Sequence, residues 1–426
     1  MMHETETQIE RAILVGVHTG SGDVLLDTTE ESIAELEELA KTAGVEVVGY
    51  LVQNRKSPDA ATYIGDGKLE ELRNAADELD ADTIIFDDEL SPVQVRNISD
   101  HLERKVIDRT SLILDIFAMR AATKEGKIQV ELAQLRYMLP RLTGMGRALS
   151  RLGGGIGTRG PGETKLETDR RHIRRRIEFL SDELKEVEKH RGLLRARREK
   201  DNKTVVALVG YTNAGKSTLL NLLTDAQVFA EDKLFATLDP TQRSLTLSDN
   251  REILLVDTVG FIRKLPHHLV KAFKSTLEEA ALADVLLHVI DASNDEFAAH
   301  IEVVERILSE LGAGGKPTVA VLNKMDLAEG KILPHTVESC TKTVCISAKK
   351  RTGIDALLEA VEEVVPGRKR EVSLCIPYSE ARLVSALHED QVVLNEEYAE
   401  TGILVTALVD AACYNTVRRY VTDRQV

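Results

Sequence analysis

Short apolar runs and amphipathic stretches alternate along the first quarter of the chain. Residues 11–18 form an apolar run of strand length, and residues 32–43 carry apolar side chains at helical spacing. Further strand-like runs lie at residues 45–52, 83–86 and 106–108. A helix opened by Gly65-Asp66-Gly67 is predicted at 68–79. Strands that alternate with helices indicate a small α/β domain with a largely parallel sheet, which we assign to residues 1–112.

No strand pattern interrupts residues 113–200, which we call the helical arm. Helical spacing is seen on both sides of one break at 152–162, where six glycines and one proline cannot form the interior of a helix. After the break, residues 163–198 are highly charged, with apolar side chains three to four positions apart. This spacing predicts one helix of a helical hairpin.

A second alternating pattern fills residues 201–366. Its strand-like runs are separated by helical segments and lie at residues 204–209, 252–256, 285–290, 318–322 and 343–346. The pattern predicts a larger α/β domain with a mostly parallel, doubly wound sheet. A linker at 366–370 follows it. In residues 371–426 a strand at 371–376, a helix at 379–388 and a strand at 402–408 predict a small α+β domain.

The composition is typical of several folded domains in water. The chain has 426 residues, 43% of them apolar, and at roughly 100–200 residues per domain this length fits two to four domains. No run approaches about 18 uncharged apolar residues, and residues 1–6 are acidic where a signal peptide is basic. The cysteines lie in apolar or strand-like surroundings without CxxC spacing, at Cys340, Cys345, Cys375 and Cys413. We expect a cytoplasmic monomer with reduced cysteines that serve packing.

The acidic average hides one basic stretch. Lys and Arg number 55 and Asp and Glu 70, which gives a net charge of -15 and a pI of about 5.3. Alone, this balance argues against a general attraction to nucleic acid or anionic lipid. Residues 136–176, the basic segment, hold ten arginines and one lysine against three acidic residues. Their net charge is +8, so the other 385 residues carry -23.

A phosphate-binding loop, or P-loop, lies between the strand at 204–209 and the next helical stretch. The motif G-x-x-x-x-G-K-[ST] is matched by Gly210, Tyr211, Thr212, Asn213, Ala214, Gly215, Lys216 and Ser217. Its glycines let backbone N–H groups surround a phosphate at a helix N-terminus. Lys216 is placed to reach the β- and γ-phosphates of a nucleotide, and the Ser217 hydroxyl to ligate Mg²⁺.

Three further motifs follow in the order that a GTPase requires. They consist of Asp257, Thr258, Val259 and Gly260; of Asn323, Lys324, Met325 and Asp326; and of Ser347, Ala348 and Lys349. Each follows a predicted strand. Asp257 is placed to act on the magnesium shell from outside the direct ligands, and the Gly260 N–H to meet the γ-phosphate.

The second and third of these motifs indicate which base is bound. The Asp326 carboxylate can accept hydrogen bonds from the ring N–H and the exocyclic amine of guanine. Adenine lacks this pair of donors and would leave the carboxylate without partners. Backbone groups of residues 347–349 can hold the guanine oxygen. The motifs therefore predict GTP, and not ATP, as the substrate.

Residues 235–241 lie between the P-loop and the DxxG motif at 257–260, and we interpret them as the switch I loop. Nucleotide contacts are expected from Phe235, Ala236, Thr237, Leu238 and Asp239. Thr237 is our candidate for the second hydroxyl ligand of Mg²⁺, and Thr241 is the alternative that spacing does not exclude. We assign catalytic roles to Lys216, Thr237 and Gly260.

Two positions bear on the rate of hydrolysis. Many GTPases carry a glutamine directly after the DxxG motif to orient the attacking water, whereas this chain has Phe261. A phenyl ring cannot orient water by hydrogen bonding, so we expect slow intrinsic hydrolysis that a partner accelerates. Asn213 stands where asparagine often accompanies K⁺ beside the phosphates. It is equally well interpreted as a turn residue that stabilises the loop.

The motifs resemble those of the HflX family of ribosome-associated GTPases over roughly residues 10–365. The resemblance rests on the P-loop, on switch I, and on residues 63–72 (YIGDGKLEEL), 134–137 (QLRY), 153–157 (GGGIG) and 160–164 (GPGET). It implies an N-terminal α/β domain, a helical arm, a G domain and a variable C-terminal part. It also implies GTP turnover on the large ribosomal subunit and, in bacteria, splitting of stalled ribosomes. It favours Thr237 over Thr241 as the Mg²⁺ ligand.

The resemblance gives the basic segment a role. Its arginines can neutralise rRNA phosphates, and they are Arg136, Arg141, Arg147, Arg151, Arg159, Arg170, Arg171, Arg174, Arg175 and Arg176. We predict a GTP hydrolase that binds the large ribosomal subunit and remodels or dissociates ribosomes. One alternative is a regulatory switch that binds a protein partner, for which the basic segment has no obvious use. Another is a tRNA-modification GTPase, for which the sequence offers no candidate catalytic cysteine or cofactor-binding motif.

Overall fold

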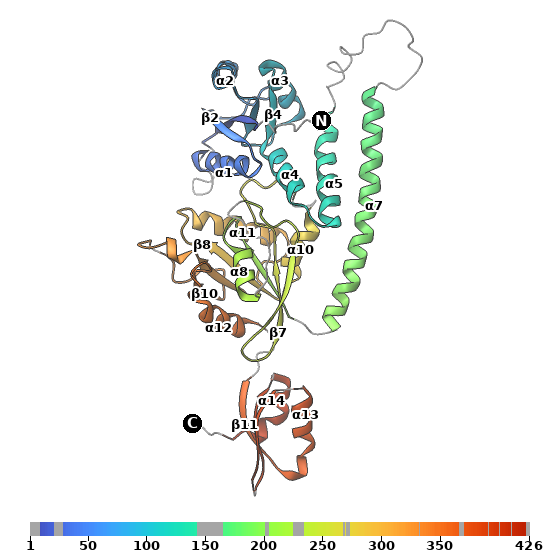
Figure 1. The fold of residues 1–426 in the computed structure, drawn as a ribbon, viewed down its shortest axis with the longest axis vertical. Coiled ribbons are helices and arrows are strands. Elements are labelled where there is room, and N and C mark those ends of the chain that lie inside the picture. The colour runs from blue at the N-terminus through green and yellow to red at the C-terminus, as the bar shows by residue number, and fades with distance from the viewer. Residues whose placement is uncertain are drawn as a thin grey trace, which may run out of the picture.

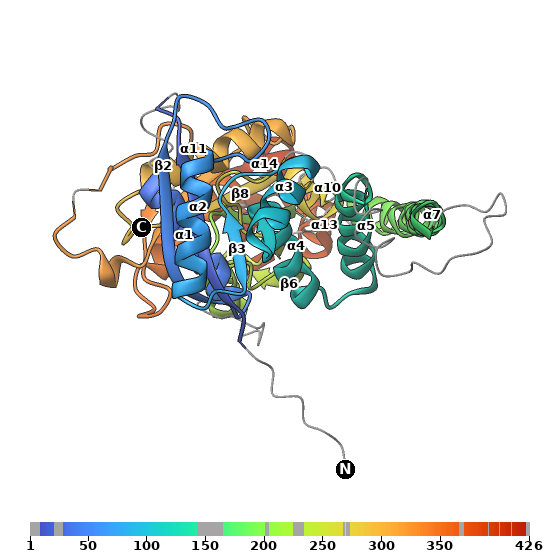
Figure 2. The ribbon, with the colours of Figure 1, turned by 90° about the horizontal axis from the view of Figure 1, so that it is seen from above.

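The computed structural model describes residues 9–20, 29–142, 165–200, 204–224, 234–266, 269, 273–331, 333–365, 370–390, 392–399, 401–409 and 411–422. Three bodies, each with its own sheet, follow one another along the longest axis, and the helical arm runs beside the first two (Figure 1). Viewed from above, helix α7 of the arm lies outermost on one side (Figure 2). Within the described part of the chain, no helix combines the length and apolar character needed to cross a bilayer.

Four parallel strands form the sheet of the N-terminal domain. They are β1 (Arg11–His18), β2 (Glu46–Asn54), β3 (Thr83–Phe86) and β4 (Lys105–Asp108), in the order β2-β1-β3-β4. Since side chains alternate along a strand, neighbouring residues of β1 enter different cores. Leu14 packs on the side of α1 (Thr29–Thr42) and α4 (Arg109–Arg120), and Ile13 on the side of α2 (Asp66–Glu78) and α3 (Pro92–Leu102). The predicted parallel sheet is confirmed, and Gly65 is the N-cap of α2, as expected of a helix-opening turn.

The helical arm contains two long helices that pack side by side. They are α5 (Lys124–Arg141) and α7 (Lys165–Lys200), and their contact buries Ile128, Leu132 and Leu180. Ion pairs join Lys124 to Glu183 and Glu131 to Arg176, so the two helices run antiparallel. The predicted helical hairpin is confirmed for these residues. Its glycine-rich break at 152–162 lies outside the described part of the chain.

The third part of the chain, the G domain, contains a six-stranded sheet. Its strands are β5 (Thr204–Gly210), β6 (Thr241–Thr246), β7 (Glu252–Asp257), β8 (Val285–Asp291), β9 (Thr318–Asn323) and β10 (Lys342–Cys345). They are ordered β10-β9-β8-β5-β7-β6, and only β6 runs antiparallel to its neighbour. Helices α10 (Lys274–Leu282) and α11 (Phe297–Glu310) share the core on one face. Helices α8 (Lys216–Thr224) and α12 (Ile354–Val364) cover the other.

One continuous apolar core joins the N-terminal domain, the arm and the G domain. Buried side chains of α1, α4 and α5 belong to the same cluster as Phe235, Phe261 and Phe273 of the G domain. In Figure 1, α1 and α4 lie between the two sheets. Because Phe235 packs directly on Phe117 of α4, we expect a movement of this loop to affect α4 as well.

The C-terminal domain is a three-stranded antiparallel sheet with two helices. Its elements are β11 (Arg370–Ile376), α13 (Arg382–Asp390), β12 (Val392–Ala399), β13 (Gly402–Val409) and α14 (Ala411–Val417), with strand order β11-β13-β12. The predicted strands at 371–376 and 402–408 are confirmed. Strand β12 is missing from the sequence prediction, because polar residues at 395–397 break the apolar alternation of this sheet edge.

The other missed strand is β6. It lies at the edge of the G-domain sheet, and none of its residues is buried. A polar edge strand of this kind carries no alternating apolar pattern, so it is recognised only from its pairing with β7 in the structure.

One expectation about the cysteines is wrong, since Cys345 on β10 is exposed and cannot serve packing.

Candidate active site

The P-loop connects β5 to α8, and two of its glycines are required by close contacts. Gly210 has a φ of 150°, and a Cβ there would lie 2.2 Å from the carbonyl oxygen of Val289. Gly215 has a φ of 95°, and a Cβ there would lie 2.4 Å from Nδ2 of Asn323. Any side chain at either position would displace β8 or the base-binding motif. The loop therefore brings backbone N–H groups to the N-terminus of α8, where an anion is stabilised.

Lys216, the first residue of α8, is buried at the centre of this site. Its Nζ donates to the carbonyl oxygens of Gly210 at 3.1 Å and Tyr211 at 2.8 Å. Burial lowers the pKa of Lys216 to about 8, and the negative charge of Asp257 opposes this shift. An ammonium group with so few compensating charges is suited to bind phosphate oxygens.

Three oxygen-bearing side chains converge next to Lys216. Oγ of Ser217 donates to Oδ2 of Asp257 at 2.6 Å and lies 2.7 Å from Oγ1 of Thr237. Oδ1 of Asp257 is buried and has no hydrogen-bond partner, and burial raises the pKa of this carboxyl. Hydroxyl and carboxylate oxygens around an unsatisfied atom fit Mg²⁺, which binds oxygen ligands and retains several waters. Thr241 begins β6 instead, in register with Asp257.

The DxxG motif ends beside the same lysine. A Cβ at position 260 would lie 3.1 Å from Nζ of Lys216 and 2.8 Å from Cα of Thr212, so only glycine fits. Phe261 pairs with the P-loop through its backbone, since its N–H donates to Gly210 O and its carbonyl accepts from Thr212 N. The Phe261 ring is completely buried in the apolar core. The ring is therefore not available to the attacking water, in agreement with the expectation that Phe261 cannot replace the usual glutamine.

The base-binding motifs are held against the P-loop by Asn323. Its buried side chain donates from Nδ2 to Ala214 O at 2.9 Å and accepts at Oδ1 from Ala348 N at 3.0 Å. Oγ of Ser347 donates to Oδ1 of Asp326 at 2.6 Å, and this hydrogen bond lowers the pKa of Asp326. A carboxylate that stays ionised and is fixed in orientation can read the two guanine donors. Nearby, Lys324 forms an ion pair with Asp291.

Several predicted nucleotide contacts direct their side chains elsewhere. Thr258 donates to Leu208 O inside the sheet, and Val259 and Leu238 are buried in apolar surroundings. Phe235 packs on Phe117 of α4 with ring centroids 4.8 Å apart. The side chains at these positions are therefore engaged in packing or in the sheet. Asn213 is exposed with a φ of 60°, which suits a turn residue.

The side chain of Tyr211 leaves the P-loop for the N-terminal domain. Its ring stacks on His300 at a centroid distance of 3.7 Å. Its hydroxyl donates to Glu35 of α1 and accepts from the backbone N–H of Arg263 at 2.8 Å. Arg263 and Lys264 follow the DxxG motif, and we call residues 257–265 the switch II segment. The sequence analysis missed this interface, although two adjacent cations after a GTPase motif are a usable signal.

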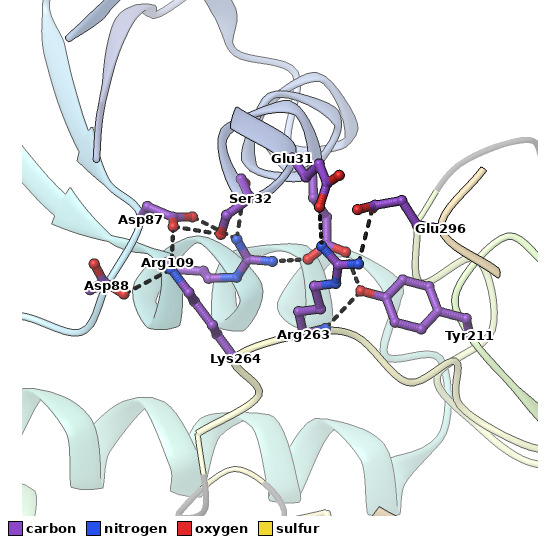
Figure 3. Close-up of polar contacts among 10 residues, drawn as sticks. Glu31, Ser32, Asp87, Asp88, Arg109, Tyr211, Arg263, Lys264 and Glu296 are labelled. Atoms are coloured by element: carbon purple, nitrogen blue, oxygen red, sulfur yellow. Dashed lines mark hydrogen bonds and ion pairs between the residues drawn. The ribbon is translucent and has the colours of Figure 1, made fainter. Parts of the chain in front are cut away.

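Acidic residues of the N-terminal domain bind both cations of the switch II segment (Figure 3). Nζ of Lys264 lies 2.6 Å from Oδ2 of Asp87 and 3.0 Å from Oδ1 of Asp88. Arg263 pairs with Glu31 at 3.4 Å and with Glu296 of its own domain at 3.0 Å. The N-terminal domain thus holds a loop that the γ-phosphate also contacts in GTPases.

Arg109 organises the acidic side of this interface. It is 1% exposed, its Nη1 lies 2.7 Å from Oδ1 of Asp87, and its Nη2 pairs with Glu35. Asp87 also accepts a hydrogen bond from Ser32 at 2.6 Å. Burial raises the pKa of Asp87, and Lys264 opposes this rise. The carboxylate therefore depends on its cationic partners to remain charged.

Replacing Arg109 with methionine should lower the free energy of unfolding of the N-terminal part by about 3 kcal/mol, because it removes a buried cationic partner of Asp87 and Glu35. Urea unfolding followed by circular dichroism measures the change. The exposed Arg96 of α3 provides the control, since its replacement by methionine should change stability by no more than about 0.5 kcal/mol. Equal effects of the two substitutions would show that the cluster is not desolvated.

The arginines of the basic segment occupy different environments. Arg141 is turned inward, where its Nη2 lies 3.2 Å from Oδ2 of Asp108 and 2.7 Å from Leu90 O. Arg176 forms two hydrogen bonds to Glu131, and Arg136 donates to Ser181. The exposed ones on α7 are Arg171, Arg174, Arg175 and Arg176, with Arg170 half-buried. Arg147, Arg151 and Arg159 lie outside the described residues.

Comparisons with known proteins cover all of these regions. Family models described as GTP-binding GTPase N-terminal, GTP-binding GTPase Middle Region and 50S ribosome-binding GTPase match residues 30–118, 120–198 and 205–324. A GTP-binding protein from the archaeon Sulfolobus solfataricus, crystallised with GDP, is 29% identical and has a TM-score of 0.43. The match covers 84% of this chain and 98% of that one.

Relatives with the name GTPase HflX match nearly the whole chain. The protein of Caldanaerobacter subterraneus subsp. tengcongensis is 53% identical over 420 residues, which cover 99% of this chain and 96% of that protein. The protein of Escherichia coli K12 is 45% identical over 395 residues, which cover 92% of each. The P-loop, the DxxG motif and the guanine-reading motif lie together in the structure as such a protein requires. The chain belongs to the HflX family of GTPases.

Proposed function

We propose that this GTPase acts in the cytoplasm on the large ribosomal subunit and uses GTP binding and hydrolysis to remodel or dissociate ribosomes. The observation that carries the proposal is the exposed group of arginines near the start of α7, at residues 171–176. In Figure 1 this end of α7 lies beside the N-terminal domain and far from the C-terminal domain. The match to a 50S ribosome-binding family model supports the same partner.

Charge distribution supports an arm-first mode of docking. The basic segment carries +8 and the remaining residues -23, so RNA phosphates attract the arm and repel the body of the protein. Binding of this kind releases counterions, which makes the affinity fall steeply with salt. The protein would thus approach the subunit in one preferred orientation.

The nucleotide site supports a partner-dependent GTP cycle. In the proposed arrangement Ser217 and Thr237 would hold Mg²⁺, with Asp257 supporting the site from outside the direct ligands. The bound ion would help to neutralise the charge of the phosphates during hydrolysis. Lys216 and the Gly260 N–H bind the γ-phosphate. Since Phe261 is buried, the group that orients the attacking water would come from elsewhere, and we propose that the ribosome provides or positions it.

Co-sedimentation with large ribosomal subunits tests the proposal. We expect the chain to sediment with subunits when a non-hydrolysable GTP analogue is bound and to stay in solution with GDP. Charge reversal of Arg174 and Arg175 to glutamate should weaken the complex and lower the slope of log affinity against log salt by about 2, roughly one unit per lost phosphate contact. Arg176 is left intact, because it also binds Glu131.

A second charge reversal on the same helix serves as the control. Lys185 and Lys189 are exposed on α7, outside the basic segment, and their replacement by glutamate makes the same change in net charge. This variant should bind subunits with nearly the wild-type salt slope. If both double variants bind like the wild type, the arm does not contact rRNA. If binding is equal with GDP and the GTP analogue, the nucleotide does not control the complex.

A further inference from the structure

Switch I packs against the corner between α4 and α5. The Phe235 ring meets Phe117 near the end of α4 in an edge-to-face contact with an interplanar angle of 79°. Phe117 makes a similar contact with Phe273, at a centroid distance of 4.7 Å. Leu238 is also buried. The loop that carries Thr237 is therefore wedged between the G domain and the helical arm.

The carboxylate of Asp239 continues this contact to the first turn of α5. It accepts hydrogen bonds from Ala122 N at 2.8 Å, from Thr123 N at 2.9 Å and from the Thr123 hydroxyl. Thr123 is the N-cap of α5, and its Oγ1 accepts from Gly126 N at 3.0 Å. Backbone N–H groups at a helix N-terminus lack partners within the helix, and a negative charge there is stabilised by the helix dipole.

The sequence of α5 makes room for this carboxylate. A Cβ at Gly126 would lie 2.5 Å from Oδ1 of Asp239. Glycine inside a helix lowers helix stability relative to alanine. The close approach of Asp239, which lies more than a hundred positions away along the chain, explains why a glycine stands at position 126. The match between Gly126 and Asp239 is thus a specific contact between switch I and the arm.

We infer that Asp239 is a positioning residue for GTP hydrolysis, whose carboxylate fixes switch I to the start of α5 and thereby lets the helical arm respond to the bound nucleotide. Thr237 lies two residues before Asp239, and its hydroxyl is 2.7 Å from Oγ of Ser217. In GTPases the γ-phosphate and Mg²⁺ order switch I, and hydrolysis releases it. Anchoring Asp239 therefore keeps Thr237 beside Ser217, where both would hold Mg²⁺, and loss of the γ-phosphate would release the contact at the start of α5.

The coupling acts in both directions. Suppose that GTP raises the affinity of the chain for a partner that holds α5 in this position. That partner must then raise the affinity of the chain for GTP by the same factor. The expected effect of Asp239 on hydrolysis depends on the nucleotide site alone. Only the idea that a ribosome makes use of this coupling rests on the proposed function. Experiments on the isolated chain therefore test the inference separately from ribosome binding.

Kinetics of three variants test the positioning role. Replacing Asp239 with alanine should lower kcat about tenfold and raise the Mg²⁺ concentration that gives half-maximal activity, since a charged acceptor of three hydrogen bonds is lost. Asp239→Asn keeps one acceptor and should retain more activity. Gly126→Ala leaves the carboxylate intact but displaces it, and should lower kcat and raise the Mg²⁺ requirement as Asp239→Ala does. Lys127→Ala, at an exposed position in the same turn, is the control with wild-type kinetics.

Hydrogen exchange tests the link to the arm. The amides of Ala122 and Thr123 should exchange more slowly with a GTP analogue than with GDP in the wild type, and this difference should disappear in Asp239→Ala and Gly126→Ala. Circular dichroism shows whether each variant keeps its fold. Unchanged kcat and Mg²⁺ dependence in both folded variants would overturn the positioning role. Exchange that is independent of the nucleotide in the wild type would overturn the coupling.

Discussion

Replacing Lys216 with alanine should lower kcat for GTP hydrolysis roughly 100- to 1,000-fold, the loss that follows removal of one preorganised donor to a transition-state charge. The ammonium group is held by two P-loop carbonyls and lies 3.1 Å from the position of a Cβ at residue 260. It is thus fixed beside Gly260, whose N–H we propose to bind the γ-phosphate. Phosphate release at saturating GTP measures the loss.

The matched control is Lys342, an exposed lysine of the same domain that pairs with Glu363. Lys342→Ala should hydrolyse GTP at the wild-type rate. Because the Lys216 side chain also supports the P-loop backbone, the fold of the Lys216→Ala variant should be checked by near-ultraviolet circular dichroism. A folded variant that kept more than about a tenth of the wild-type kcat would show that Lys216 does not stabilise the transition state.

Replacing Asp326 with asparagine should weaken GTP binding by about a thousandfold and make xanthosine triphosphate the preferred nucleotide. A carboxylate accepts from both guanine donors, whereas an amide offers one acceptor and one donor. The amide donor faces the exocyclic amine of guanine unfavourably, but it matches the carbonyl oxygen that xanthine has at the same position. Competition between the two nucleotides in an equilibrium binding assay measures the change in preference.

Ser347→Ala separates base recognition from general damage to the loop. Its hydroxyl donates to Oδ1 of Asp326 at 2.6 Å, so its loss should weaken GTP binding without changing the preferred base. If Asp326→Asn retained a preference for GTP over xanthosine triphosphate, the carboxylate would not be the group that reads guanine. A shift in preference in Ser347→Ala would instead indicate that the loop as a whole sets specificity.

The P-loop and the base-binding motifs could be predicted from the sequence, because the residues of each motif follow one another along the chain. The P-loop runs without interruption from Gly210 to Ser217, and each base-binding motif directly follows an apolar strand. The carboxyl ends of parallel strands meet at one sheet edge, so order along the chain predicts proximity in space. The structure accordingly brings Ser217, Thr237 and Asp257 together.

Contacts between distant segments were not accessible in this way. The pairing of Lys264 with Asp87 joins residues 177 positions apart, and no periodic pattern links them. Charge alone also misleads, since Arg141 was grouped with RNA-binding arginines and is instead 16% exposed beside Asp108. Asp239 was grouped with the nucleotide contacts, and the partners of its carboxylate at the start of α5, Ala122 and Thr123, could not be predicted. Which partner a charged side chain takes depends on the tertiary fold.

The length of α7 would turn a small tilt at its C-terminal part into a larger displacement of its arginine-rich N-terminal part. Near its C-terminal end Arg191 pairs with Glu125 of α5 and Glu279 of α10, so this part is tied to the nucleotide domain. The helix rises 1.5 Å per residue, so the arginines at 171–176 lie about 22–30 Å from Arg191 along its axis, and a tilt of about 5° about this point would move them by about 2–3 Å. A small tilt of the helix would therefore displace the exposed arginines by a large part of the spacing between neighbouring phosphates along a duplex axis, about 3.4 Å per strand.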